Sequence, residues 1–246
     1  GMNARFAQGI RHGMPIALGY LSVSFAFGMQ AVGSGLTWIQ AVLISATNLT
    51  SAGQLAALPI MAAGGSLGEM ALTQLTINLR YALMGLSLGR KLDESMGTLQ
   101  RMIFAFADTD EIFAVAFSQP GKVGKTYLYG LMTAPWIGWT LGTLLGAAAG
   151  TLLPAFIRTA LGIAIYGMFL AIILPPARKE APVRFVVGLA VAMSFCFRYI
   201  PGLNRVSGGF VIIICAVAAA AAGAALFPAE NTGDGASVSE KGEEEA

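Results

Sequence analysis

The chain has 246 residues, of which 56% are apolar and only 11% are charged. This composition excludes an ordinary soluble domain and is typical of a membrane protein that crosses the bilayer several times. The formal net charge is +2. We expect no nucleic-acid binding, because an excess of basic residues in such a chain is explained by loops on the cytoplasmic side of the bilayer.

Six apolar segments have about the 17–25 residues that a membrane-spanning helix needs. They cover residues 15–32, 67–88, 127–150, 155–174, 184–200 and 204–227. Pro15 suits the first turn of the first span, where its missing N–H costs nothing. We expect residues 1–12 to form a cytoplasmic N-terminus, residues 13–227 a single transmembrane domain, and residues 228–246 a disordered acidic tail.

Residues 45–54 are polar or small and lie between apolar flanks at residues 36–44 and 55–63. Irregular backbone at membrane depth survives only inside protein or beside a wet cavity. Ser51 and Gln54 have the spacing of a capping box, which predicts a break with a new half-helix starting at Ser51. The alternative is one continuous helix with a polar packing face.

A half-helix that begins within the membrane presents free N–H groups and suits an anionic group such as a carboxylate. We therefore predict that a substrate carboxylate binds beside this break. The predicted substrate-binding residues are Asn48, Thr50, Ser51, Gln54 and, in the next helix, Asn78.

The segment 102–118 is apolar except for Asp108, Asp110, Glu111 and Thr109 between them. Asp108 and Glu111 have cap spacing, so this segment is a second candidate for a broken helix. Arg80 lies in the middle of an apolar helix, where an arginine needs a partner. Asp110 is its first candidate, ahead of Asp108 and Glu111. These four residues form either a coupling site for transport or a structural ion pair with helix caps.

The positions of lysine and arginine distinguish two topologies. If both broken elements re-enter on the side from which they came, Arg90, Lys91 and Arg101 join Lys122 and Lys125 inside. If both cross, the first three fall outside. Cytoplasmic loops of membrane proteins carry an excess of lysine and arginine. This positive-inside rule favours an all-α polytopic fold with about six full spans and two re-entrant elements; the alternative is eight crossing helices.

Four small residues form a ridge on the 127–150 span, and little else in the chain points to chemistry. Gly138, Gly142, Gly146 and Gly150 recur every four residues, which favours close helix packing within the chain or at an interface to a second subunit. His12 is the single histidine, and the chain has no phosphate-binding loop. We expect no enzyme activity, no cofactor and no metal site.

Four stretches resemble the AzlC-like family, the large subunit of branched-chain amino-acid exporters, across roughly residues 11–227. They are residues 24–28 (SFAFG), 48–54 (NLTSAGQ), 78–88 (NLRYALMGLSL) and 109–114 (TDEIFA). The resemblance implies a multi-pass protein of the bacterial inner membrane that exports valine, leucine and isoleucine, with methionine as a further candidate. It also implies a small hydrophobic AzlD-like partner subunit. Separately, protonation of Asp110 beside Arg80 is expected to couple export to the proton gradient. A passive channel and a scaffold subunit without its own pathway remain the alternatives.

Overall fold

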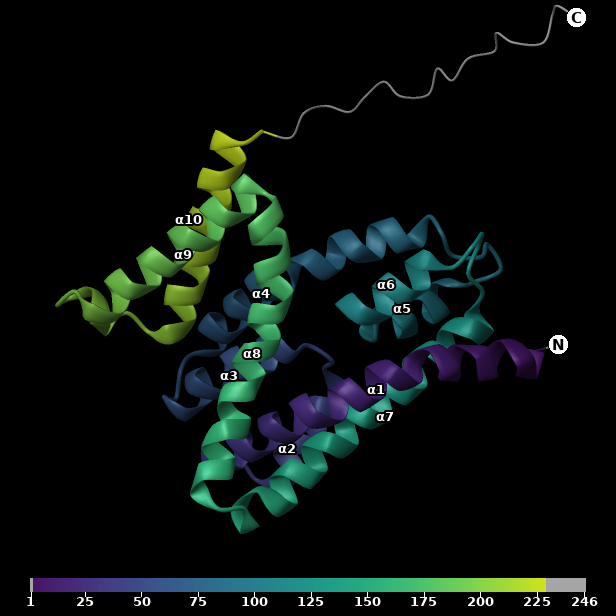
Figure 1. The fold of residues 1–246 in the computed structure, drawn as a ribbon, viewed down its shortest axis with the longest axis horizontal. Helices are drawn as coiled ribbons and strands as arrows, with labels where there is room; N and C mark the ends of the chain where they lie inside the picture. Colours follow the sequence, from purple (N-terminus) through teal and green to yellow (C-terminus); the bar gives the residue numbers. More distant parts are fainter. Residues whose placement is uncertain (1, 229–246) are drawn as a thin grey trace, which may run out of the picture.

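The computed structural model describes residues 2–228, and every regular element in that part of the chain is a helix (Figure 1). The α-helices are α1 (Met2–Gly33), α2 (Trp38–Thr47), α3 (Ser51–Ala62), α4 (Leu67–Gly89), α5 (Thr98–Phe106), α6 (Asp110–Ser118), α7 (Lys125–Ala149), α8 (Ala155–Lys179), α9 (Ala181–Tyr199) and α10 (Gly208–Leu226). The predicted acidic tail falls almost wholly on residues 229–246, outside the described part.

The all-α polytopic class is confirmed. Within the described residues, α1, α8, α9 and α10 are long and apolar enough to cross a membrane. Helices α4 and α7 have 23 and 25 residues. At ~1.5 Å per residue they too exceed the ~30 Å hydrocarbon core. These six helices match the six predicted spans.

Helices α1 and α7 pack in parallel along most of their length, and glycines make this close approach possible. A Cβ on Gly130 would lie 2.2 Å from the carbonyl oxygen of Phe6, and one on Gly146 would lie 1.9 Å from that of Phe25. The glycine ridge of α7 is therefore filled by α1 of the same chain. The alternative of a subunit interface on this ridge is wrong, because the space is already occupied.

The first helix begins much earlier than predicted. Pro15 lies inside α1 rather than in its first turn. The preceding residues stay helical because they pack on the start of α7: Gly9 contacts the backbone of Tyr127, and His12 Nδ1 lies 2.7 Å from the Tyr127 hydroxyl. This packing outweighs the single backbone hydrogen bond that a proline removes.

The two broken elements both re-enter, as the charge pattern predicts. Leu92, just after α4, pairs with Val123, just before α7, so α4 ends where α7 begins. The helix pair α5–α6 therefore starts and ends at that one end of the molecule. Because α7 starts beside the start of α1, α4 runs antiparallel to α1, and α2–α3 form the matching hairpin at the other end (Figure 1).

Basic residues from the end of α4 to the start of α5 gather at the same end as the start of α7. The Lys122 Nζ atom donates a 3.0 Å hydrogen bond to the carbonyl oxygen of Arg90. The Arg101 guanidinium donates to the carbonyl oxygen of Gly89 at 3.4 Å. The alternative of eight crossing helices would separate Arg90 from Lys122 by the membrane and is wrong.

Glu69 ties the C-terminal helices to the rest of the fold. Ser66 caps α4 by accepting a hydrogen bond from the Glu69 backbone N–H at 3.1 Å. The Glu69 carboxylate instead accepts from the Gly209 N–H at 3.1 Å and from the Ser207 hydroxyl, at the start of α10. Beyond this contact the outer helices are sparsely covered: α9 has no buried residue.

Candidate functional site

The first break separates α2 from α3, and neighbouring helices hold both halves. On the α2 side, Ser45 Oγ lies 2.6 Å from Thr143 Oγ1 of α7, and Trp136 donates to the carbonyl oxygen of Ala46 at 2.9 Å. On the α3 side, Gln74 of α4 donates to the carbonyl oxygen of Gly53 at 2.8 Å. The expected break is therefore present, and the continuous helix is excluded.

The cap of α3 lies one residue earlier than predicted. Thr50, not Ser51, is the N-cap, and its Oγ1 accepts a hydrogen bond from the Gly53 N–H at 3.2 Å. The same hydroxyl donates to Asn78 Oδ1 at 2.8 Å. Ser51 thus becomes the first residue of the helix. Its N–H belongs to the first turn, whose donors have no partner within the helix.

Gln54 has a structural role at the break. Its side chain is 1% exposed, and its amide nitrogen donates to the carbonyl oxygens of Asn48 and of Ile44 at 3.3 Å. The side chain thus bridges the break and satisfies carbonyl groups at the end of α2, which would otherwise lack partners. Gln54 lines neither of the cavities described below.

The second break separates α5 from α6, and its cap also differs from the prediction. Thr109 is the N-cap of α6 and accepts from the Ile112 N–H at 3.4 Å. The expected Asp108–Glu111 cap pair is wrong, because a threonine between them takes that position. Glu111 Oε2 instead lies 2.6 Å from the hydroxyl oxygen of Tyr20, on α1.

Arg80 and Asp110 form the ion pair that the sequence suggests. The Arg80 Nη1 atom lies 2.6 Å from Asp110 Oδ2, and Nη2 donates to the Tyr81 hydroxyl at 3.2 Å. The two charged side chains are 45% and 35% exposed. They are therefore not sealed in the core but form part of a cavity wall.

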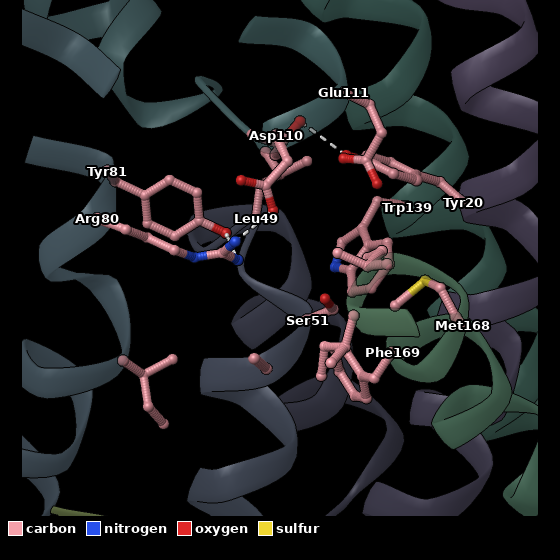
Figure 2. A pocket seen from close by; sticks show the side chains of 15 residues that line it. Tyr20, Leu49, Ser51, Arg80, Tyr81, Asp110, Glu111, Trp139, Met168 and Phe169 are labelled. Carbon is pink, nitrogen blue, oxygen red and sulfur yellow. Dashed lines mark hydrogen bonds and ion pairs between the residues drawn. The ribbon is translucent and has the colours of Figure 1, made fainter. Parts of the chain in front are cut away.

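This cavity, called the main cavity, measures about 210 Å³ and lies between the two breaks, α1, α4, α7 and α8. Figure 2 shows Arg80, Asp110 and Glu111 converging with Tyr20 and Ser51, while Trp139, Met168 and Phe169 approach from another side. The apolar part of the wall consists of Leu49, Ile77, Trp139, Met168, Phe169, Ile172 and Ile173. The cavity therefore combines both signs of charge with an extended hydrophobic surface.

A second cavity of about 260 Å³ shares Tyr81 with the main cavity. Its lining is Thr47, Asn48, Leu49, Thr50, Asn78, Tyr81, Ala105, Phe106, Asp108 and Thr109. Leu49, Tyr81 and Thr109 line both cavities, so the two are neighbours. Of the predicted substrate-binding residues, only Ser51 reaches the main cavity; Asn48, Thr50 and Asn78 line the second.

Several residues of the main cavity were not predictable from the sequence. Tyr20, Trp139 and Met168 come from α1, α7 and α8, which the fold brings beside the breaks. Tyr20 packs edge-to-face on Trp139 with ring centroids 5.3 Å apart. No local pattern distinguishes these residues from other apolar residues of a membrane helix.

Comparison with known proteins identifies the family of the chain. The family model described as AzlC protein matches residues 15–153. The chain is 28% identical to the inner membrane protein YgaZ of Escherichia coli over 78% of this chain and 81% of that protein. It is 30% identical to an uncharacterized membrane protein of Archaeoglobus fulgidus over 78% of this chain and 85% of the relative. No solved structure matches the chain. The chain belongs to the AzlC family of membrane proteins.

Proposed function

We propose that this protein is a secondary transporter that exports branched-chain amino acids across the bacterial inner membrane, with the main cavity as its substrate site. Membership of the AzlC family is consistent with a transporter. The observation that carries the proposal is the pairing of opposite charges with an apolar wall in a single cavity. A free apolar amino acid presents the complementary set: a carboxylate, an ammonium group and a hydrophobic side chain.

The geometry suggests a role for each part of the wall. Arg80 and the first turn of α3, at Ser51 and Ala52, offer a guanidinium and helix N–H groups to the carboxylate. Glu111 has the Tyr20 hydroxyl as its hydrogen-bond partner and offers its charge to the ammonium group. The hydrophobic side chain would lie against Trp139 and the α8 residues.

The size of the cavity agrees with a small substrate. Pockets for drug-sized ligands measure roughly 300–1,000 Å³, whereas this one measures about 210 Å³. Valine, leucine, isoleucine and methionine are the substrates proposed. Because the charged groups fix only the amino-acid head, discrimination among these four depends on the apolar wall.

We extend the proposal to energy coupling and to a partner. Protonation of Asp110 would weaken its pair with Arg80 and bias one hairpin against the other, which would couple export to the proton gradient. A small AzlD-like subunit would cover part of the apolar surface of α8 and α9. In the described part of the chain, only one residue of α8 and none of α9 is buried. Crosslinking from single cysteines on α9 to a coexpressed small subunit tests the partner.

Ligand binding tests the substrate site directly. Calorimetry on the purified full chain should detect leucine but neither leucinol, which lacks the carboxylate, nor 4-methylpentanoate, which lacks the ammonium group. Arg80→Gln and Glu111→Gln should each weaken leucine binding at least tenfold, or ~1.4 kcal/mol. Glu94→Gln, in the exposed loop after α4, is the matched control. Equal binding of leucine and leucinol would refute the proposed site.

A further inference from the structure

Seven of the ten residues that line the second cavity have an oxygen atom in their side chain. The hydroxyls of Thr47, Thr50 and Thr109 and the amides of Asn48 and Asn78 surround it, and Tyr81 adds a phenol. The described residues that line it include one carboxylate, Asp108, and no lysine, arginine or histidine. Oxygen ligands with a single negative charge suit a small cation and do not suit an anion.

Asp108 is the unusual member of this set. The residue is 5% exposed, and its Oδ1 atom is buried without a hydrogen-bond partner. The neighbouring charged groups are already engaged: Asp110 is paired with Arg80, and Glu111 with the Tyr20 hydroxyl. A buried carboxylate without a partner is costly, so the group needs either a proton or a cation beside it.

The ends of the half-helices divide between the two cavities. The main cavity receives the N-terminal first turns of α3 and α6, at Ser51 and Asp110. The second cavity receives the C-terminal ends of α2 and α5, at Thr47 and Phe106. Helix C-termini carry the negative end of the dipole and free carbonyl groups, which favour a cation. The N-cap residues Thr50 and Thr109 also line the second cavity, but the helical residues of α3 and α6 reach only the main cavity, and those of α2 and α5 only the second.

We propose that the second cavity is a monovalent-cation site, for a proton or a sodium ion, with the Asp108 carboxylate as its charged ligand. The Asn48 and Asn78 side chains and the Thr50 hydroxyl would supply neutral oxygens around it. As a coupling site for transport, this cavity rests on the proposed function. As a cation site, it stands on its own geometry.

The shared wall gives the two cavities a means of communication. Tyr81 lines both, and its hydroxyl accepts the hydrogen bond from Arg80, which is paired with Asp110. A cation bound at Asp108 would therefore act on the same three residues that shape the charged side of the main cavity. Occupancy of the second cavity is expected to change the affinity of the first.

Two measurements on the purified full chain decide the identity of the ion. Radioactive sodium binding, in choline chloride at constant ionic strength, tests the sodium form. Infrared difference spectra between acidic and alkaline buffer test the proton form, through the carbonyl band of a protonated carboxyl group. Either saturable sodium binding weakened at least tenfold by Asp108→Asn, or a titrating carboxyl band lost in that variant, supports the proposal. Glu94→Gln should retain the signal.

Absence of both signals in the unaltered protein, or their persistence in Asp108→Asn, would overturn the cation site. If Asp108→Asn does not fold, Asn48→Ala takes its place and must weaken sodium binding or shift the carboxyl band. An unchanged signal in Asn48→Ala would then overturn the proposal. Leucine binding is measured on the same samples. If the unaltered protein gives the cation signal but does not bind leucine, the proposed substrate is rejected and the cation site is retained.

Discussion

Removing the charge of Asp110 should weaken the link between the α5–α6 hairpin and α4. Exposed ion pairs contribute ~0–1 kcal/mol, whereas breaking a fully buried pair costs ~3–5 kcal/mol. The Arg80–Asp110 distance of 2.6 Å indicates a strong contact, but the side chains are 45% and 35% exposed. Arg80 also keeps a second partner, the Tyr81 hydroxyl at 3.2 Å. We therefore expect a coupling energy of about 1–2 kcal/mol.

The assay is a double-mutant cycle of Asp110→Asn and Arg80→Gln, scored by unfolding in mixed micelles and by leucine transport at several pH values. A proton switch predicts that Asp110→Asn folds and binds leucine but loses the pH dependence of transport. A permanent structural pair predicts poor insertion or unfolding, partly rescued by Arg80→Gln. Normal, fully pH-dependent transport by Asp110→Asn, with a coupling energy near zero, would refute both interpretations.

Three further outcomes follow from the packing and hydrogen bonds. Gly146→Ala should destabilise the fold by about 1–3 kcal/mol, because its Cβ would meet the Phe25 carbonyl oxygen; Gly19→Ala, with nothing within 4 Å, should not lower the melting temperature. Gln54→Leu should cost about 1–3 kcal/mol in unfolding free energy without changing leucine affinity; weaker leucine binding by a fully stable variant would return Gln54 to the substrate site. The pKa of Asp93 is lowered by a hydrogen bond from the backbone N–H two residues later. The Ser95 N–H should therefore exchange more slowly than an unstructured amide at the same pH as long as the pH is above ~4, and this protection should be lost as the pH falls through that lowered pKa. Asp93→Asn should abolish this change, and an unaltered profile would contradict the assignment.

The sequence indicated both breaks and both hairpins, because polar clusters and basic residues are local signals with a direct meaning in a membrane. The cap of α3 was predicted one residue too late, because two overlapping pairs have the spacing of an N-cap residue and its partner: Thr50 with Gly53, and Ser51 with Gln54. Only the tertiary structure decides between them, by using Gln54 to bridge the break. Pro15 was misleading for a similar reason, because packing against α7 extends the helix through it.

The candidate site was predictable only in part. Arg80, Asp110 and Glu111 are conspicuous because charge is rare at membrane depth. Trp139 and Met168 carry no such signal, because an apolar residue in a membrane helix is expected whether or not it lines a cavity. Separation of the polar residues into two cavities also depends on how the hairpins meet across α4, which no spacing in the sequence encodes.

Transport by proteoliposomes containing the full chain, with and without a small AzlD-like partner, tests the central claim most directly. Vesicles are loaded with radioactive leucine, and its movement is followed with and without an imposed pH gradient. The proposal predicts leucine movement against its concentration gradient that requires the pH gradient and is lost in Glu111→Gln. Movement only down the leucine gradient, indifferent to pH, would mean a passive channel. Undiminished transport after neutralising both Arg80 and Asp110 would mean that the pathway lies outside this chain.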